Sequence, residues 1–126
     1  MPVPNDKETL YRVLDQMVAA LQADETFKQR IAHADVSVGL TVSDLGGDYI
    51  LAFRQGEITG QAGASSGASI GVTLNMATLD KLFSGLLDGE SAYMSGQLRL
   101  RGDEWTAQSA AYYISFITPA YKAARG

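Results

Sequence analysis

The sequence predicts an α+β fold in which helices cover one face of a mostly antiparallel sheet of about five strands. Two observations support this fold class. Apolar residues alternate with small or polar residues in several short segments, as expected of half-buried strands. Apolar residues also recur every three or four positions before, between and after these segments, as expected of amphipathic helices. With 126 residues, the chain is expected to form one domain over 1–126.

The N-terminal segment 1–23 is expected to form the first helix. Asn5 or Asp6 can cap this helix, and its apolar face carries Leu10, Val13, Leu14, Met17, Val18 and Leu21. Asp24 can begin a second, shorter helix that carries Phe27 and Ile31. Strands are predicted over 36–42, 49–54, 57–61 and 68–74, with glycine-containing turns at 45–48, 55–56 and 63–67 between them.

The second half of the chain begins with Asn75, which can cap a helix over about 77–87. A short turn or helix over 90–94 should then lead into the last strand. Residues 97–101 alternate, so Leu98 and Leu100 should face the core while Arg99 and Arg101 face water. The C-terminal segment 103–126 is expected to be helical. Its helix is capped by Asp103 and should run to about Thr118, where Pro119 breaks or kinks it.

Composition and charge exclude several functions. The net charge of −4 lacks the basic footprint that nucleic-acid binding needs. No apolar run approaches the roughly 20 residues that cross a bilayer, so stable membrane insertion is not expected. No signal peptide is visible, and the absence of cysteine fits a reducing compartment. We therefore expect a cytoplasmic protein.

Catalytic and metal-binding residues are not evident. His33 is the only histidine, and its place near a helix end is more typical of a surface or helix-terminal cation than of a general base. Without cysteine or a second histidine, a zinc site is not expected. Asp80, Asp88, Glu90, Asp103 and Glu104 lie near helix ends, where capping and solvation explain them. We therefore predict no catalytic residue, no metal and no cofactor.

Two linked motifs carry a family resemblance. The helix over 77–87 contains Leu79-x-x-Leu-Phe-x-Gly85, and 92–103 has the form Ala-Tyr-Met-x-Gly-x-Leu-x-Leu-x-Gly-Asp. Together they resemble the sterol carrier protein-2 family, whose small domains hold sterols, fatty acids or fatty acyl chains. The resemblance is densest over 68–103. It implies that the sheet and the helices enclose an apolar lipid tunnel.

The resemblance also implies which residues border the tunnel. The positions that match the family's helix and the segment after it are Leu79, Leu82, Phe83, Leu86, Tyr93, Met94, Leu98 and Leu100. Three aromatic residues of the C-terminal segment, Trp105, Tyr112 and Phe116, either pack on the sheet as ordinary core or line the pocket and offer polar groups to a ligand. Both alternatives stay open from sequence, and all eleven residues are candidates for ligand contact.

Three functions remain compatible with the sequence. The first is non-catalytic binding and transport of a hydrophobic ligand such as a fatty acid, an acyl chain or a sterol-like lipid. The second is an accessory or dimerisation domain that works with a lipid- or sterol-metabolising enzyme, with a homodimer left open. The third, ranked last, is an enzyme that modifies a small molecule in an apolar pocket.

Overall fold

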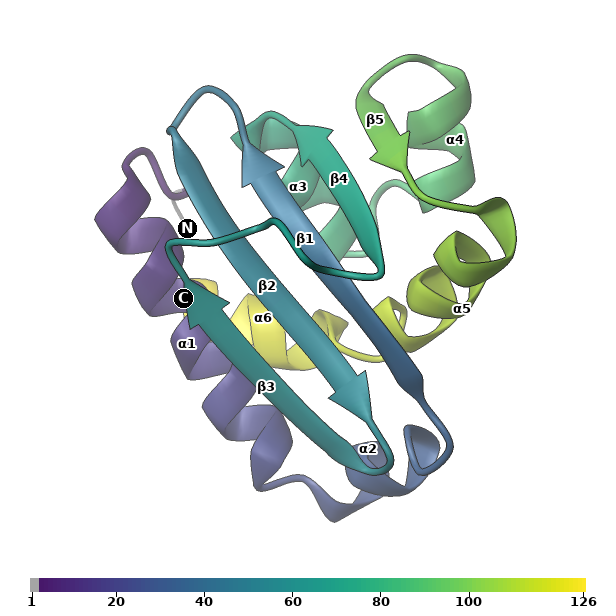
Figure 1. The fold of residues 1–126 in the computed structure, drawn as a ribbon. Coiled ribbons are helices and arrows are strands. Elements are labelled where there is room, and N and C mark those ends of the chain that lie inside the picture. Colours follow the sequence, from purple (N-terminus) through teal and green to yellow (C-terminus); the bar gives the residue numbers. More distant parts are fainter. Residues whose placement is uncertain (1–2) are drawn as a thin grey trace.

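The computed structural model describes residues 3–126, so the first two residues of the predicted segment 1–23 lie outside the described part (Figure 1). The helices are α1 (Lys7–Gln22), α2 (Glu25–Arg30), α3 (Met76–Phe83), α4 (Gly89–Met94), α5 (Glu104–Ile114) and α6 (Thr118–Arg125). The strands are β1 (Asp35–Val42), β2 (Gly47–Arg54), β3 (Glu57–Ala62), β4 (Ile70–Leu74) and β5 (Leu98–Arg101). The predicted five-stranded α+β fold is confirmed.

The sheet has the strand order β3-β2-β1-β4-β5. Three neighbouring pairs are antiparallel, but β1 and β4 run parallel, so the sheet is mixed. The parallel pair exists because the connection over 63–69 carries the chain from the β3 edge back across β2 and β1 before β4 begins (Figure 1). Short-range alternation could not predict this crossing.

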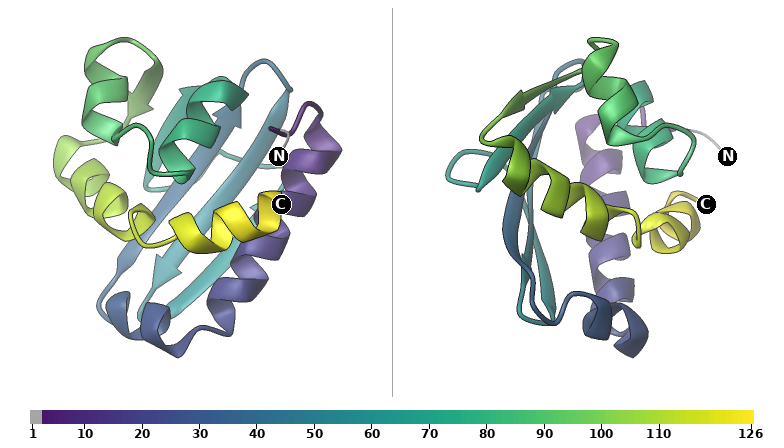
Figure 2. Two further views of the ribbon diagram at one scale, coloured as in Figure 1. Left: turned by 180° about the vertical axis from the view of Figure 1, so that it is seen from behind. Right: turned by 90° about the vertical axis from the view of Figure 1, so that its right-hand side faces the viewer.

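All the helices described lie on one side of the sheet, and the connection over 63–69 lies on the other (Figure 2). The core fills the space between the sheet and α1. The face of α1 predicted to be apolar is buried in full, and on β2 the alternation of Tyr49, Leu51 and Phe53 turns those three side chains toward the helices. No helix of residues 3–126 is long and apolar enough to cross a membrane.

Carboxylate and amide side chains set where five helices begin. In each case the side chain before the helix accepts a hydrogen bond from a backbone N–H of the first turn, which would otherwise lack a partner. These caps are Asp6, Asp24, Asn75, Asp88 and Asp103. The predicted caps Asp6, Asn75 and Asp103 are therefore confirmed.

Two predicted helix ends are wrong. The helix expected over 77–87 ends at Phe83, because Gly85 adopts a φ of 79° that terminates the helix. The helix expected to run from Asp103 to about Thr118 ends at Ile114. Pro119 does not simply break it; it stands in the first turn of a separate helix, α6, where its missing N–H costs nothing.

Candidate functional site

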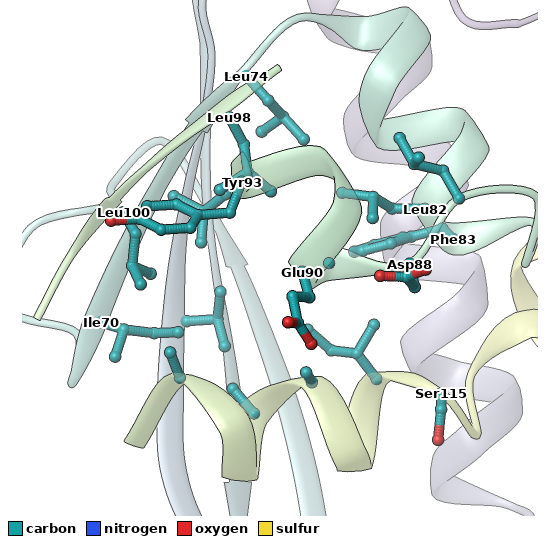
Figure 3. Close-up of a pocket in the computed structure, with 18 of the residues that line it drawn as sticks. Ile70, Leu74, Leu82, Phe83, Asp88, Glu90, Tyr93, Leu98, Leu100 and Ser115 are labelled. Atoms are coloured by element: carbon teal, nitrogen blue, oxygen red, sulfur yellow. The ribbon is translucent and has the colours of Figure 1, made fainter. Parts of the chain in front are cut away.

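A partly open cavity of ≈ 920 Å³ lies between the sheet and the helices (Figure 3). Its sheet wall consists of Val38 and Leu40 from β1, Ile70, Val72 and Leu74 from β4, and Leu98 and Leu100 from β5. Helices α3, α4 and α5 form most of the remaining walls, with residues of the 84–88 segment, Ser115 and Thr118. The structure therefore contains an apolar chamber where the family resemblance placed one, while a continuous tunnel stays a prediction.

The cavity exists because α5 turns small side chains toward the sheet. Ala107, Ala110 and Ala111 line the cavity, together with Ile114. Alanine fills little of the distance between a helix and a sheet, so β1, β4 and β5 face unfilled space. Two aromatic residues of α5 point away from the cavity: Trp105 is 79% exposed and Tyr112 is 60% exposed. The alternative that Trp105 and Tyr112 pack on the sheet is therefore wrong, whereas their neighbour Tyr113 stacks on Phe53 of β2.

Seven of the eleven candidate residues line the cavity: Leu79, Leu82, Phe83, Tyr93, Met94, Leu98 and Leu100. The other four, Leu86, Trp105, Tyr112 and Phe116, do not line it. Leu86 lies beyond the early end of α3 and is 78% exposed. Phe116 follows the end of α5, where its ring contacts Tyr112 and the guanidinium of Arg30 instead.

Sequence reasoning missed two parts of the cavity wall. The first is β1 and β4, whose residues Val38, Ile70 and Val72 lie in segments predicted only as strands. The second is the small-residue face of α5. A run of alanines at helical spacing, opposite an aromatic face, is the signal that could have indicated unfilled space.

The polar residues of the cavity wall are acidic or neutral. They are Asp88, Glu90, Tyr93, Glu104, Gln108, Ser115 and Thr118, and among residues 3–126 no lysine, arginine or histidine lines the cavity. Glu90 extends from α4 toward α5 (Figure 3). The backbone N–H and hydroxyl of Ser91 donate to Asp88 and lower the pKa of its carboxyl, so Asp88 is ionised at neutral pH. The polar wall is therefore negatively charged.

Helix α3 is held in place by a buried polar cluster. The Tyr121 hydroxyl donates to Asp80 Oδ1 over 2.7 Å, and Arg125 Nη1 donates to both Asp80 carboxylate oxygens over 2.8 and 2.9 Å. Burial, with the Asp80 carboxylate next to it, raises the pKa of Tyr121, which keeps its hydroxyl protonated as the donor. Assigning Asp80 to capping and solvation was wrong, because this residue is buried and paired with α6.

The same helix pair also packs through aromatic rings. Phe83 contacts Tyr121 edge-to-face with ring centroids 5.5 Å apart, and both rings are buried. Because Leu79, Leu82 and Phe83 of α3 line the cavity, α6 determines the position of one cavity wall. The C-terminal helix thus acts on the site without lining most of it.

A further question is whether the described residues could hold a metal ion. Across residues 3–126, no three His, Asp or Glu side chains lie close enough together to hold a metal ion. His33 is exposed and lies beyond the end of α2. What the geometry provides is apolar enclosure with a negatively charged polar rim.

Fold and cavity together define an α+β domain with an apolar chamber between its sheet and its helices. The sequence model of the SCP-2 sterol transfer family matches residues 14–113. The chain therefore belongs to this family. No protein of curated function matches the chain in sequence.

Solved structures share this fold. A conserved hypothetical protein from Thermus thermophilus, described as possibly a sterol carrier protein, has a TM-score of 0.73 at 16% identity; the match covers 98% of this chain and 91% of that one. A sterol carrier protein 2 has a TM-score of 0.66 at 20% identity, covering 90% and 93%.

A larger enzyme contains a similar domain. The stereoselective inverting sec-alkylsulfatase of a Pseudomonas species has a TM-score of 0.63 at 24% identity, and the match covers 81% of this chain. It covers only 16% of the sulfatase. The likeness is therefore to a small part of that enzyme and concerns the fold.

Proposed function

We propose that this protein binds and carries a hydrophobic ligand in the cavity between the sheet and α3, α4 and α5, without chemistry of its own. The observation that carries the proposal is an apolar cavity of ≈ 920 Å³ in a chain of the SCP-2 sterol transfer family. The seven candidate residues that line this cavity, with the alanines of α5, are the proposed ligand contacts. A sterol-like body or a long acyl chain supplies the matching apolar surface.

The size of the cavity suits such a ligand. Its volume falls within the roughly 300–1,000 Å³ of typical small-molecule sites. Each methylene group that leaves water contributes about 0.8 kcal/mol, so a long chain can supply the roughly 8 kcal/mol of micromolar binding after the cost of ordering it. Apolar contact alone therefore accounts for useful affinity.

The charged rim distinguishes between head groups. Asp88, Glu90 and Glu104 offer acceptors to a hydroxyl group but repel a carboxylate, and no cationic side chain of the described residues lines the cavity to offset them. We therefore expect a long-chain alcohol or a sterol hydroxyl to bind better than a fatty acid of the same length. The three carboxylates are exposed to solvent, so this preference is modest and screened by salt.

A displacement titration tests the proposal. Delipidated protein is loaded with a fluorescent sterol, which is then displaced by hexadecanol or by hexadecanoate at low and high ionic strength. We expect saturable binding, with the alcohol several-fold tighter at low salt and a smaller difference at high salt. No saturable uptake of any lipid would contradict the carrier function, while a tighter carboxylate would contradict only the head-group assignment.

The likeness to part of a sec-alkylsulfatase favours one alternative, an accessory or dimerisation domain that works with a lipid-metabolising enzyme. Native mass spectrometry separates the two functions. A monomer that retains a co-purified lipid supports the carrier. A tight dimer without lipid, unaffected by added lipid, supports the accessory domain.

A further inference from the structure

A second groove of ≈ 440 Å³ lies on the face of the sheet opposite the cavity. The connection over 63–69, which crosses this face in Figure 1, forms one wall, and residues of β1, β4 and β5 form the rest. Glycine, serine, threonine and arginine make up most of its lining, beside Val72 and Leu100, in contrast to the cavity. Gly39 lies beneath the Ser65 carbonyl group and Gly71 beneath the Arg101 guanidinium, and Arg99 and Arg101 stand at one side.

Strand register explains how these residues meet. Gly39 of β1 is aligned with Gly71 of β4, which is aligned with Arg101 of β5. In the next row on this face, Thr41 is aligned with Thr73, and Thr73 with Arg99. On this face of the sheet, each of two adjacent cross-strand rows of residues therefore ends in an arginine on the edge strand β5. Glycines lie beside Arg101, and threonines lie beside Arg99.

The Arg101 guanidinium occupies space that a side chain at position 71 would take. A Cβ added to Gly71 would lie 2.9 Å from Arg101 Nε and 3.0 Å from Nη2. Glycine thus lets the guanidinium lie against the strand. The ion pairs found across residues 3–126 involve Lys28, Arg54 and Arg125, so neither Arg99 nor Arg101 has a carboxylate partner in the described part of the chain.

The opposite wall is fixed by hydrogen bonds. Ser37 and Ser69 donate a backbone N–H to each other's hydroxyl oxygen over 3.1 and 2.8 Å. The hydroxyls of Ser65 and Thr41 donate to Asp48 Oδ1 over 2.9 and 3.1 Å. Asp48, which is aligned with Thr41 at the far end of the Arg99 row, is thus occupied by these hydroxyls rather than by an arginine.

We propose that this outer groove binds the phosphate group of an anionic ligand. Two guanidinium groups without a carboxylate partner in residues 3–126 and the Thr73 hydroxyl supply the hydrogen-bond donors of a depression with room for a tetrahedral anion and a small attached group. Guanidinium groups form paired N–H bonds with phosphate oxygens, and this geometry favours phosphate over a spherical anion such as chloride. The site is separate from the lipid cavity and goes beyond the proposed function.

Nuclear magnetic resonance titrations of the whole chain test the site. The probes are inorganic phosphate, glycerol 3-phosphate, and vesicles of phosphatidylcholine with or without phosphatidic acid. We expect the Nε signals of Arg99 and Arg101 and the amide of Thr73 to shift saturably with phosphate probes. If these signals shift with inorganic phosphate or glycerol 3-phosphate, the groove binds a soluble phosphate ligand. If they shift only with vesicles that contain phosphatidic acid, the groove binds a lipid head group.

Matched variants show whether the groove is responsible. Arg99→Gln with Arg101→Gln should weaken phosphate binding roughly tenfold or more, since hydrogen bonds to charged groups are the strong ones. Arg12→Gln changes an exposed arginine of α1 and should leave binding unchanged. Gly71→Ala keeps the net charge but displaces the Arg101 guanidinium, so it should also weaken binding; melting curves confirm that each variant is folded. Absence of a saturable shift, or equal weakening by Arg12→Gln, would overturn the proposal.

Discussion

Asp80→Ala is expected to destabilise the protein by ~3 kcal/mol, the lower end of what breaking a buried ion pair costs. Asp80 is 7% exposed and accepts hydrogen bonds from Tyr121 and Arg125. Its loss leaves the guanidinium and the phenol without their partner between α3 and α6. The Arg125 side chain keeps 19% exposure and can partly rehydrate, which is why the lower figure applies.

Chemical unfolding measures this effect, and a double-mutant cycle with Arg125→Ala isolates the pair. Because the two side chains interact directly, the double variant should be clearly less destabilised than the sum of the single variants. If the two effects simply add, or if Asp80→Ala costs less than about 1 kcal/mol, α3 is not held by this cluster.

Phe83→Ala is expected to change both stability and ligand selectivity. The ring is 2% exposed, packs on Tyr121 and also lines the cavity. Emptying a packed phenylalanine site costs ~3–5 kcal/mol, and the lower end applies because one side of the ring already borders free space. Removing the ring enlarges the cavity, so affinity should shift toward bulkier ligands.

A melting curve and a lipid titration on Phe83→Ala show whether Phe83 serves only as a packed core residue or also as part of the cavity wall. Leu86→Ala is the matched control, since Leu86 lies three residues further along, is 78% exposed and does not line the cavity. It should change neither quantity. A large loss of stability in Phe83→Ala with unchanged ligand preference would show that Phe83 is core only.

Local patterns in the sequence predicted most of the fold. The alternation over 97–101 correctly predicted that Leu98 and Leu100 face the helices. The spacing of apolar residues before Gln22 correctly predicted the buried face of α1. The caps Asp6, Asn75 and Asp103 were predictable because a capping side chain acts on its own helix. Such features depend on neighbours within a few positions.

Features that depend on distant residues were not predictable. The burial of Asp80 follows from the docking of Tyr121 and Arg125, 41 and 45 residues further on. Trp105 and Tyr112 are exposed because the alanine side of α5 faces the sheet. Sequence could not predict this orientation, because the alanine side and the aromatic side of the helix are both apolar enough to be buried. An apolar pattern predicts that a surface is buried. Whether other side chains or a ligand cover that surface depends on the volumes of the side chains on the helix and the sheet that face each other.

Blocking the cavity tests most directly the claim that it is the ligand site. Ala107 lines the cavity from α5, so Ala107→Trp places an indole in the space proposed for the lipid. Ala123→Trp, on the exposed side of α6, is the matched control. In titrations of delipidated protein with a radiolabelled sterol or long-chain alcohol, we predict saturable binding to the unmodified chain and to Ala123→Trp. Folded Ala107→Trp should bind at least tenfold more weakly, and unchanged binding by it would contradict the assignment of the cavity as the lipid site.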